Sequence, residues 1–126
     1  MKKIIFTENA PKAIGPYSQA VEVNGTLYIS GQIPVDPKTG KIVEGGVTEQ
    51  TEMVMKNIEA ILKEAGYTFA DVVKSTCLID NMDNFAAMNE VYGKCYAENS
   101  PARAAYQVAK LPLGVMVEIE TIAVKG

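Results

Sequence analysis

VMVEIETIAV, residues Val115–Val124, is the stretch that decides which fold the chain can adopt. Successive side chains of a strand point to opposite faces of its sheet. One face of this strand would carry Val117, Ile119, Thr121 and Ala123, and the other Met116, Glu118, Glu120, Ile122 and Val124. Both faces are largely apolar, which is typical of a strand buried on both sides. We therefore expect helices to cover one face and a second subunit to cover the other.

Turn and helix signals divide the rest of the chain into strands and two helices. Further strands are predicted at Ile4–Phe6, Ala20–Val23, Thr26–Ser30, Val72–Ile79 and Ala102–Ala109. Asn24-Gly25 predicts a hairpin, because a type I′ turn needs positive φ at both central residues. One helix is expected between an N-cap at Thr48 and a C′ glycine at Gly66, and Asp83 is expected to cap a second.

The resulting element order is β-β-β-α-β-α-β-β, with a turn-rich loop from Pro34 to Gly46 before the first helix. Two helices can cover one face of such a sheet but not both. The order therefore predicts an α+β fold with a mixed β-sheet and two helices packed on one face.

Length and charge narrow the kinds of protein that this chain can be. Its 126 residues predict a single domain, residues 1–126. A net charge of −3 and a pI near 5.0 count against a nucleic-acid partner, which usually requires a basic patch. The apolar run Ile4–Phe6 is too short for a signal peptide, and no stretch approaches membrane-spanning length. We expect a cytoplasmic protein without membrane contact.

The residue types that are absent restrict the chemistry further. The sequence has no histidine, no P-loop and no GxGxxG motif, which argues against a Ser-His or Cys-His nucleophile and against a nucleotide cradle. Cys77 and Cys95 have no metal-binding spacing and are expected to be reduced, buried thiols. We expect no metal and no other cofactor, so catalysis would depend on Arg, Glu, Tyr, Ser, backbone amides and water.

Arg103 is the single arginine beside eleven lysines, and it lies at the start of the strand predicted at Ala102–Ala109. Alternation places it with Ala105, Gln107 and Ala109, so small neighbours leave space around the guanidinium. Arginine differs from lysine because its planar fork binds a carboxylate through two parallel hydrogen bonds. Two interpretations stay open from the residues alone: an internal ion pair with Glu118 or Glu120, or a carboxylate ligand.

Glu118 and Glu120 share one face of the last strand, among apolar residues. Carboxylates in such a setting need partners, since burial penalises their charge. One could pair with Arg103 or a lysine and the other could act as a general base with a raised pKa. The alternative is that both lie on the solvated face of an edge strand.

Two short loop motifs could also contribute to a site. Tyr17, in GPY (Gly15–Tyr17), could donate a hydrogen bond to a ligand or simply close a loop. In SGQIP (Ser30–Pro34), Gly31 would let a backbone N–H approach a ligand without obstruction from a Cβ atom. Each motif by itself is weak.

Together these stretches resemble the Rid family, also called YjgF-like proteins or reactive-intermediate (enamine/imine) deaminases, and also known as endoribonuclease L-PSP-like proteins. The resemblance extends along essentially the whole chain, and PAR with VEIE is its most specific part. The matching stretches are TENAPKAIGPYSQAV, YISGQIPVDPKTGKIV, the helix ending in AG, NFAAMNEVY, SPARAAYQVAKLP and VEIETIAV. The resemblance implies a chorismate-mutase-like fold and a homotrimer with active sites between subunits.

The resemblance also implies an activity. Members hydrolyse 2-aminoacrylate or 2-aminocrotonate, through the 2-imino acid, to a 2-oxo acid and ammonia. These compounds are released by pyridoxal-phosphate-dependent serine and threonine dehydratases, which links the family to isoleucine biosynthesis and to metabolite damage control. Two alternatives remain: a non-catalytic module that binds small 2-oxo or amino acids, and the endoribonuclease or translation-inhibitor label that some members bear.

Carried over by position, the resemblance assigns roles to individual residues. Arg103 of PAR would bind the substrate carboxylate, and Glu118 of VEIE would orient or activate the attacking water. Positions lining the same cleft are Tyr17, Ser30, Gly31 and Asn89. Some members carry cysteine two residues after the PAR arginine, where this chain has Ala105. The backbone of Ala104 and Ala105 could still contact the substrate.

Overall fold

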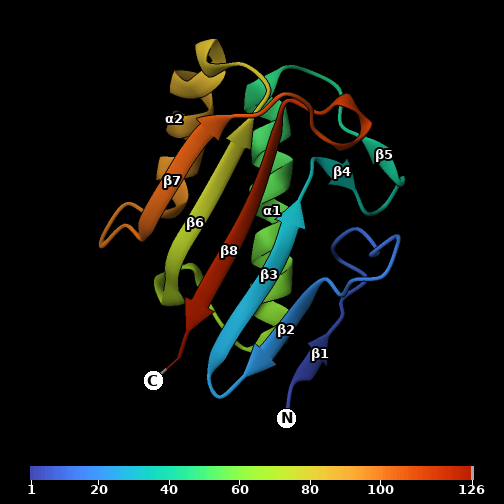
Figure 1. Ribbon diagram of the computed structural model, residues 1–126, viewed down its shortest axis with the longest axis vertical. Coiled ribbons are helices and arrows are strands. Elements are labelled where there is room, and N and C mark those ends of the chain that lie inside the picture. Colours follow the sequence, from blue (N-terminus) through green and yellow to red (C-terminus); the bar gives the residue numbers. More distant parts are fainter. Residues whose placement is uncertain (126) are drawn as a thin grey trace.

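The computed structural model describes residues 1–125, and its centre is a six-stranded mixed sheet (Figure 1). In order across the sheet, the strands are β1 (Lys3–Ile5), β2 (Ala20–Val23), β3 (Thr26–Gln32), β8 (Val117–Val124), β6 (Val72–Ile79) and β7 (Ala102–Gln107). The β6 and β7 strands are parallel, and the other neighbouring pairs of this sheet are antiparallel. The short strands β4 (Val35–Asp36) and β5 (Lys41–Ile42) form a separate hairpin.

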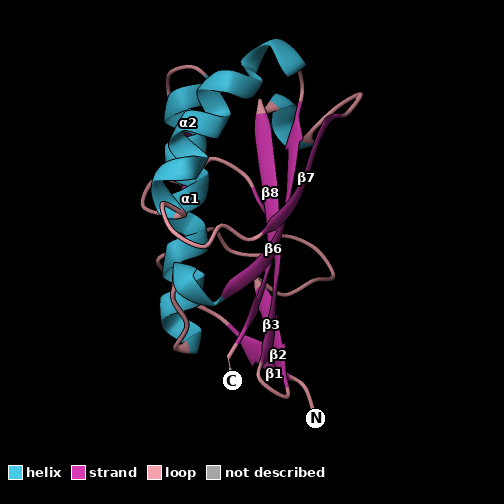
Figure 2. Ribbon diagram, turned by 90° about the vertical axis from the view of Figure 1, so that its left-hand side faces the viewer, coloured by secondary structure: helices cyan, strands magenta, loops and turns pink. Residues whose placement is uncertain are grey.

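Both α-helices, α1 (Val47–Ala65) and α2 (Phe85–Cys95), pack on the same face of the sheet (Figure 2). Short 3₁₀ turns lie at Phe69–Asp71, Met82–Asn84 and Pro112–Gly114. The predicted α+β architecture, with two helices on one face of a mixed sheet, is confirmed. Within residues 1–125, no helix has the length and hydropathy needed to cross a membrane.

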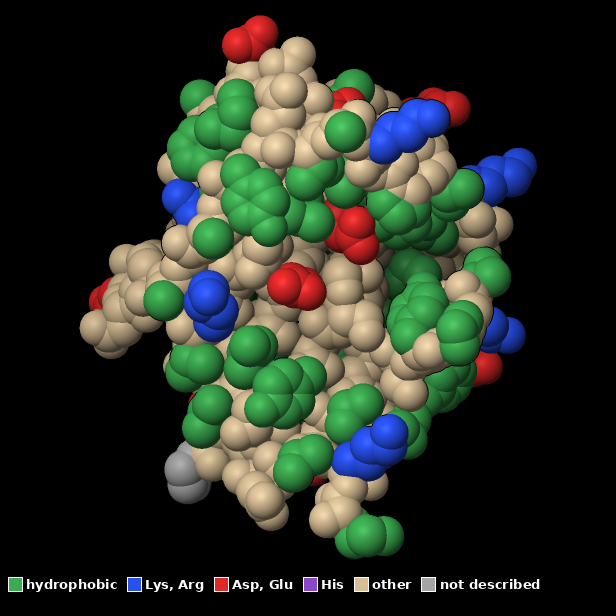
Figure 3. All heavy atoms as spheres, viewed as in Figure 1, with side chains coloured by type: hydrophobic (Ala, Val, Ile, Leu, Met, Phe, Trp, Pro, Cys, Tyr) green, Lys and Arg blue, Asp and Glu red, His purple; other side chains and the backbone are tan. Residues whose placement is uncertain are grey.

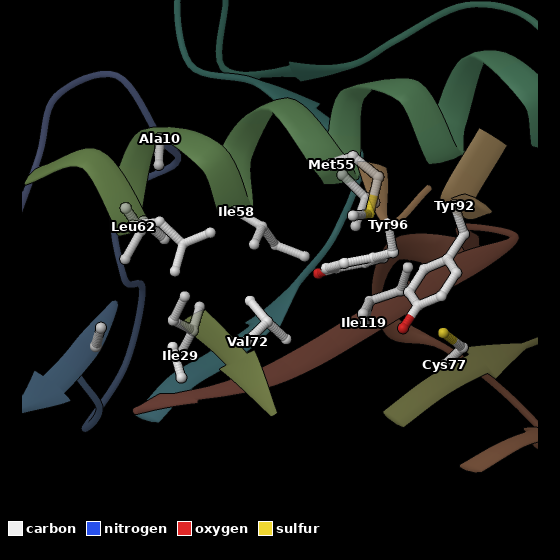
Figure 4. Close-up of a cluster of buried hydrophobic side chains, with 14 of the residues drawn as sticks. Ala10, Ile29, Met55, Ile58, Leu62, Val72, Cys77, Tyr92, Tyr96 and Ile119 are labelled. Atoms are coloured by element: carbon white, nitrogen blue, oxygen red, sulfur yellow. The ribbon is translucent and has the colours of Figure 1, made fainter. Parts of the chain in front are cut away.

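The predicted last strand, β8, lies in the middle of the sheet between β3 and β6. Its helix-facing side chains, Val117, Ile119, Thr121 and Ala123, are at most 1% exposed. They pack beneath α1, whose Ile58 and Leu62 point toward Ile29, Val72 and Ile119 (Figure 4). The opposite side of β8 is not covered by a helix, so Glu118 and Ile122 are half-buried there and Glu120 and Val124 are exposed. Within a single chain, helices therefore cover only one of the two faces of β8.

The hairpin turn and the end of the first helix were both predicted from residues that favour a positive φ. Asn24 and Gly25 have φ of 49° and 80°, as the hairpin between β2 and β3 requires. Gly66 ends α1 in the left-handed conformation, with φ of 85°, and its N–H donates to the carbonyls of Leu62 and Lys63. Both predictions are confirmed.

The predicted helix starts were wrong. Gly46, not Thr48, is the N-cap of α1, because the Glu49 Oε1 atom accepts a 2.8 Å hydrogen bond from the Gly46 N–H. Asp83 does not cap α2. Instead, the Asn81 side chain accepts a 2.9 Å bond from the Asp83 N–H and begins a 3₁₀ turn that leads into α2.

Several strand boundaries also differ from the prediction. The first strand is β1, Lys3–Ile5, rather than Ile4–Phe6, and β3 continues beyond Ser30 to Gln32. The last strand begins at Val117 rather than Val115, since the Val115 N–H closes a 3₁₀ turn and the Met116 N–H donates to Gln50 Oε1 at 2.8 Å.

The other differences lie at β7 and in the loop before α1. Strand β7 ends at Gln107, not at Ala109. The loop predicted from Pro34 to Gly46 contains the β4–β5 hairpin, so the element order gains two short strands.

Replacement of Ile58 by alanine tests the packing of α1 on the sheet. The Ile58 side chain is 0% exposed. Removing it should lower the free energy of unfolding by about 2–5 kcal/mol, because a cavity adds to the lost burial. The measurement is urea unfolding at fixed protein concentration. Glu59→Ala, at an exposed neighbouring position, should change stability by less than about 0.5 kcal/mol. Equal effects of the two substitutions would contradict this packing.

Candidate active site

Arg103 lies on the edge strand β7 and points toward helix α2. Its Nη1 donates a 2.6 Å hydrogen bond to Oδ1 of Asn89. The guanidinium carbon lies 5.4 Å from the ring centroid of Phe85 and 5.0 Å from that of Tyr92. These three α2 residues lie at helical spacing, so one face of the helix forms a cradle for the guanidinium.

The guanidinium keeps most of its hydrogen-bonding capacity for a ligand. Arginine has five N–H donors. Within residues 1–125, the guanidinium of Arg103 uses one of them in a hydrogen bond to another side chain, the bond to Asn89. The backbone of the strand edge adds to this capacity. The Val108 N–H donates to the Ile79 carbonyl at 2.9 Å, so the backbone of Val108 points toward β6. The backbone groups of alternate residues point to the same side, so the Ala104 N–H also points toward β6 and the Ala105 N–H points away from the sheet. Arg103 and the Ala105 backbone thus offer donors at one edge.

Glu118 lies on the opposite face of the sheet, in the middle of it. Its carboxylate packs against Gly31, where a Cβ atom would come within 2.2 Å of Glu118 Oε2. Gly31 lies in an irregular part of β3, between Ile29 and Gln32, where the register with β8 shifts. Burial raises the pKa of the Glu118 carboxyl, and the negative charge of Glu120 adds to the shift. The arrangement favours a carboxyl group that can exchange a proton.

The GPY loop is fastened beside this carboxylate through Ser30. The Ser30 Oγ donates to the Ser18 carbonyl at 2.6 Å, and the Ser30 N–H donates to the Gln19 carbonyl at 3.0 Å. Tyr17, one residue before Ser18, is half exposed at 52%. Its ring borders the surface hollows on both sides of Ser30 and Gly31.

A groove of about 910 Å³ runs over the open face of the sheet near these residues. It is lined by Tyr17, Ser30, Lys74, Thr76, Glu120 and Ile122, among others. Figure 3 shows this face, with acidic side chains in the middle surrounded by hydrophobic groups. Three large apolar side chains of its strands, Tyr28, Tyr106 and Val124, are 42% to 50% exposed. Such a surface is typical of a protein interface.

The structure sorts the predicted site residues into two groups. Arg103 pairs in register with Ser75, whose side chain faces the helices, whereas Glu118 pairs with Leu78 on the other face. Asn89 and Ala105 lie with Arg103, while Tyr17, Ser30 and Gly31 lie with Glu118. The internal ion pair between Arg103 and Glu118 or Glu120 is therefore excluded within one chain, because the sheet separates the charges.

Sequence reasoning missed the aromatic side chains that surround Arg103. Phe85 and Tyr92 were not predicted as site residues, because contact between α2 and β7 depends on tertiary packing. Their spacing with Asn89, at i, i+4 and i+7, was the available signal. Lys74 and Thr76, which line the groove, carried no motif.

The chain has no thiol at the position of Ala105. Cys77 is the register partner of Ala105 on β6, and its thiol is 0% exposed. Burial raises the pKa of Cys77 to about 11, although the Arg103 charge acts in the opposite direction. Cys77 and Cys95 are both free, as expected, but Cys95 is half-buried rather than buried.

The strand order, the two helices on one face and the separated arginine and glutamate define an α+β protein of the Rid (YjgF) class. The chain belongs to this family: the family model described as Endoribonuclease L-PSP matches residues 7–125. A RutC family protein of Pyrococcus horikoshii is 55% identical over 125 residues, 99% of either chain.

Two further similarities agree with this assignment. A mouse protein named 2-iminobutanoate/2-iminopropanoate deaminase is 53% identical over 126 residues, covering 100% of this chain and 93% of the mouse protein. The crystal structure of RidA from the Antarctic bacterium Psychrobacter sp. has a TM-score of 0.94 and 47% identity, covering 98% of this chain and 99% of that one.

Replacement of Gly31 by alanine tests how Glu118 is held. The added Cβ would lie 2.2 Å from Oε2, so the carboxylate should rotate away from the sheet. Its pKa should then fall toward the ordinary value of 4.5, as measured by NMR titration of the Glu118 carboxyl. The matched control is Gly93→Ala, where a Cβ meets nothing within 4 Å. An unchanged Glu118 titration in Gly31→Ala would contradict the contact.

Proposed function

We propose that the protein hydrolyses 2-imino acids to 2-oxo acids and ammonia, at sites that form between the subunits of a homotrimer. The observation that carries the proposal is the cradle of Arg103: one bond to Asn89 and two aromatic rings orient the guanidinium and leave its other donors for a carboxylate. The name of the 53% identical mouse protein supports the same chemistry. The substrates would form from 2-aminoacrylate and 2-aminocrotonate, which tautomerise from enamine to imine.

Arg103 would act by binding and orientation. A 2-imino acid carries a carboxylate next to its C=N carbon, so a bidentate grip on the carboxylate fixes the position of the reacting carbon. The outward-pointing Ala105 N–H lies on the same strand edge and could donate to the same group. Guanidinium does not deprotonate in proteins, so Arg103 does not transfer the proton.

Glu118 would handle the proton. As a water oxygen bonds to the imine carbon, the Glu118 carboxylate accepts a proton from the water and passes it to the imine nitrogen, which gives the neutral carbinolamine. The same carboxylate then moves the hydroxyl proton of the carbinolamine to the amino group. The carbinolamine then loses ammonia as its hydroxyl becomes the 2-oxo group. Water and imine are consumed, and 2-oxo acid and ammonia are produced, without any oxidant. A raised pKa suits Glu118 to both receiving and returning the proton.

Two observations support a site shared between subunits. The sheet holds Arg103 and Glu118 on opposite faces, so one chain does not bring both groups to one substrate. The open face carries exposed apolar side chains around its groove, as an interface does. In the proposed trimer, the β7 edge of one subunit meets the Glu118 face of its neighbour.

Two alternatives use parts of the same site. A binding module for 2-oxo or amino acids would need the Arg103 cradle but no proton acceptor, so the half-buried Glu118 carboxylate held against Gly31 favours the enzyme. RNA cleavage, suggested by the description of the family model, usually needs groups that neutralise phosphate charge. A sequence with a net charge of −3 and one arginine offers little for that role.

The direct test generates 2-aminoacrylate or 2-aminocrotonate with a serine or threonine dehydratase and follows the loss of the imine. The protein should accelerate this loss above the uncatalysed rate. If the imine decays at the same rate with and without the protein, the enzyme is ruled out and binding without catalysis remains.

Arg103→Lys should lose activity although the charge is kept. A point charge cannot replace the planar fork, so kcat/KM should fall on the order of 10- to 100-fold. Imine hydrolysis in the coupled dehydratase assay measures this. Lys41→Arg, on the exposed strand β5, is the control and should keep full activity. Full activity in Arg103→Lys would refute the carboxylate anchor.

Replacement of Glu118 by glutamine should lower the activity without lowering the stability of the fold. The variant should lose activity on the order of 100-fold, because it lacks the proton acceptor. In the wild type, kcat/KM should fall as pH decreases through a midpoint above 4.5, since the folded pKa is raised.

The stability effect of Glu118→Gln has the opposite sign. A raised folded pKa means that Glu118 favours folding below the unfolded pKa, and that this contribution is lost as pH rises through the folded pKa. At pH 7 the variant should therefore be at least as stable as the wild type in thermal unfolding. A variant that is active, or clearly less stable at pH 7, would contradict the assigned role.

A further inference from the structure

Four buried hydroxyl groups gather in the core behind Arg103. Ser75 on β6 and Thr121 on β8 are register partners that are 0% and 1% exposed. Tyr92 and Tyr96 on α2 are 5% and 6% exposed, and their ring centroids are 4.8 Å apart. Among the described residues, the hydroxyl oxygens of all four lack a hydrogen-bond partner.

Ser75 lies at the centre of this group. Its hydroxyl interacts with the hydroxyls of both tyrosines as a weak hydrogen-bonding neighbour, which acts against the increase in their pKa that burial causes. Neither contact has the geometry of a full hydrogen bond, so all three hydroxyls remain unsatisfied. Figure 4 shows Tyr92 directed to β6 near Cys77, whereas the Tyr96 ring extends beneath α1 toward Ile58. Buried hydroxyls without partners cost free energy, and proteins commonly satisfy such groups with internal water.

The same group of hydroxyls adjoins the candidate active site. The Tyr92 ring has its hydroxyl in the buried cluster and lies 5.0 Å from the guanidinium carbon of Arg103. No cation–π contact joins Tyr96 to Arg103 within the described residues. Tyr92 therefore links the buried cluster to the arginine, whereas Tyr96 belongs to the cluster alone.

We propose that Ser75, Thr121, Tyr92 and Tyr96 form an internal water-binding site, and that this site positions the Tyr92 ring beneath Arg103. Water held at Ser75 accepts from or donates to the tyrosine hydroxyls and limits the rotation of the Tyr92 ring. The ring in turn limits the orientation of the guanidinium. Tyr92 is thus a positioning residue for the arginine, and its effect on substrate passes through Arg103. The kinetic consequence rests on the proposed function, but the water site does not.

A high-resolution crystal structure tests the water site independently of activity. Electron density for water within hydrogen-bonding distance of Ser75 Oγ and of at least one tyrosine hydroxyl is expected in the wild type. This density should be lost in Ser75→Ala. Direct hydrogen bonds among the four hydroxyls with no water between them would overturn the proposal, as would water that persists unchanged in Ser75→Ala.

The pair Tyr92→Phe and Tyr96→Phe tests the positioning role. Each removes one hydroxyl of the cluster and keeps the ring, so both variants should fold, with a similar small decrease in thermal stability. Only Tyr92→Phe should raise KM, by roughly 3- to 10-fold, with kcat nearly unchanged. Loss of the Tyr92 hydroxyl's hydrogen bond loosens Arg103, which weakens binding of the substrate carboxylate equally in the ground state and the transition state. The Kd for 2-oxobutanoate, measured by calorimetry, should rise by the same factor.

The binding measurement keeps the two proposals distinguishable. If the wild-type protein has no deaminase activity, Tyr92→Phe should still bind 2-oxobutanoate more weakly than the wild type does. That result would support the positioning role of Tyr92 and not the proposed enzyme activity. Equal effects of the two tyrosine substitutions on KM and Kd would overturn it, since they would show a structural contribution without a specific link to Arg103.

Discussion

The placement of β8 in the middle of the sheet is the constraint on which the rest of the structure depends. Its inner side chains, from Val117 to Ala123, complete the core under α1, and this burial leaves Glu118 and Glu120 on the outer face. A shift of one residue in register would exchange the two sets and place both carboxylates in the core. The same packing that stabilises the fold therefore presents the candidate proton acceptor at the surface.

The arginine is positioned by a second, separate set of contacts. Strand β7 pairs in parallel with β6 at the sheet edge, and α2 packs behind it, so Arg103 meets Phe85, Asn89 and Tyr92. A stacked, hydrogen-bonded guanidinium loses less freedom when it binds a carboxylate than a mobile one would. Because Arg103 and Glu118 lie on different faces, the proposed function requires that each chain supply two incomplete halves of a site. Assembly would then be a condition of catalysis.

Local rules predicted much of this fold, and long-range contacts account for most of what they missed. The Asn24-Gly25 turn and the Gly66 helix end follow from the backbone of single residues, and both were predicted. The cap at Thr48 was wrong because Glu49 bonds back to Gly46, a competition that propensity alone does not rank. The two-residue strands β4 and β5 are too short to show alternation.

The candidate site shows the same division between local and tertiary information. Arg103 and Glu118 stood out because of residue type and setting. Their separation by the sheet follows from the register of β6 with both neighbours, which no single strand reveals. The aromatic cradle and the buried hydroxyls likewise depend on how α2 packs, so the sequence alone did not predict a role for Tyr92.

Mixing two inactive variants tests the shared site most directly. Subunits of Arg103→Lys and Glu118→Gln are unfolded together, refolded as mixed trimers and assayed for imine hydrolysis. If each site takes Arg103 from one subunit and Glu118 from the next, random mixing should restore about a quarter of the wild-type activity. If mixed trimers of confirmed mass stay as inactive as the separate variants, Arg103 and Glu118 do not act from different subunits, and the account is contradicted.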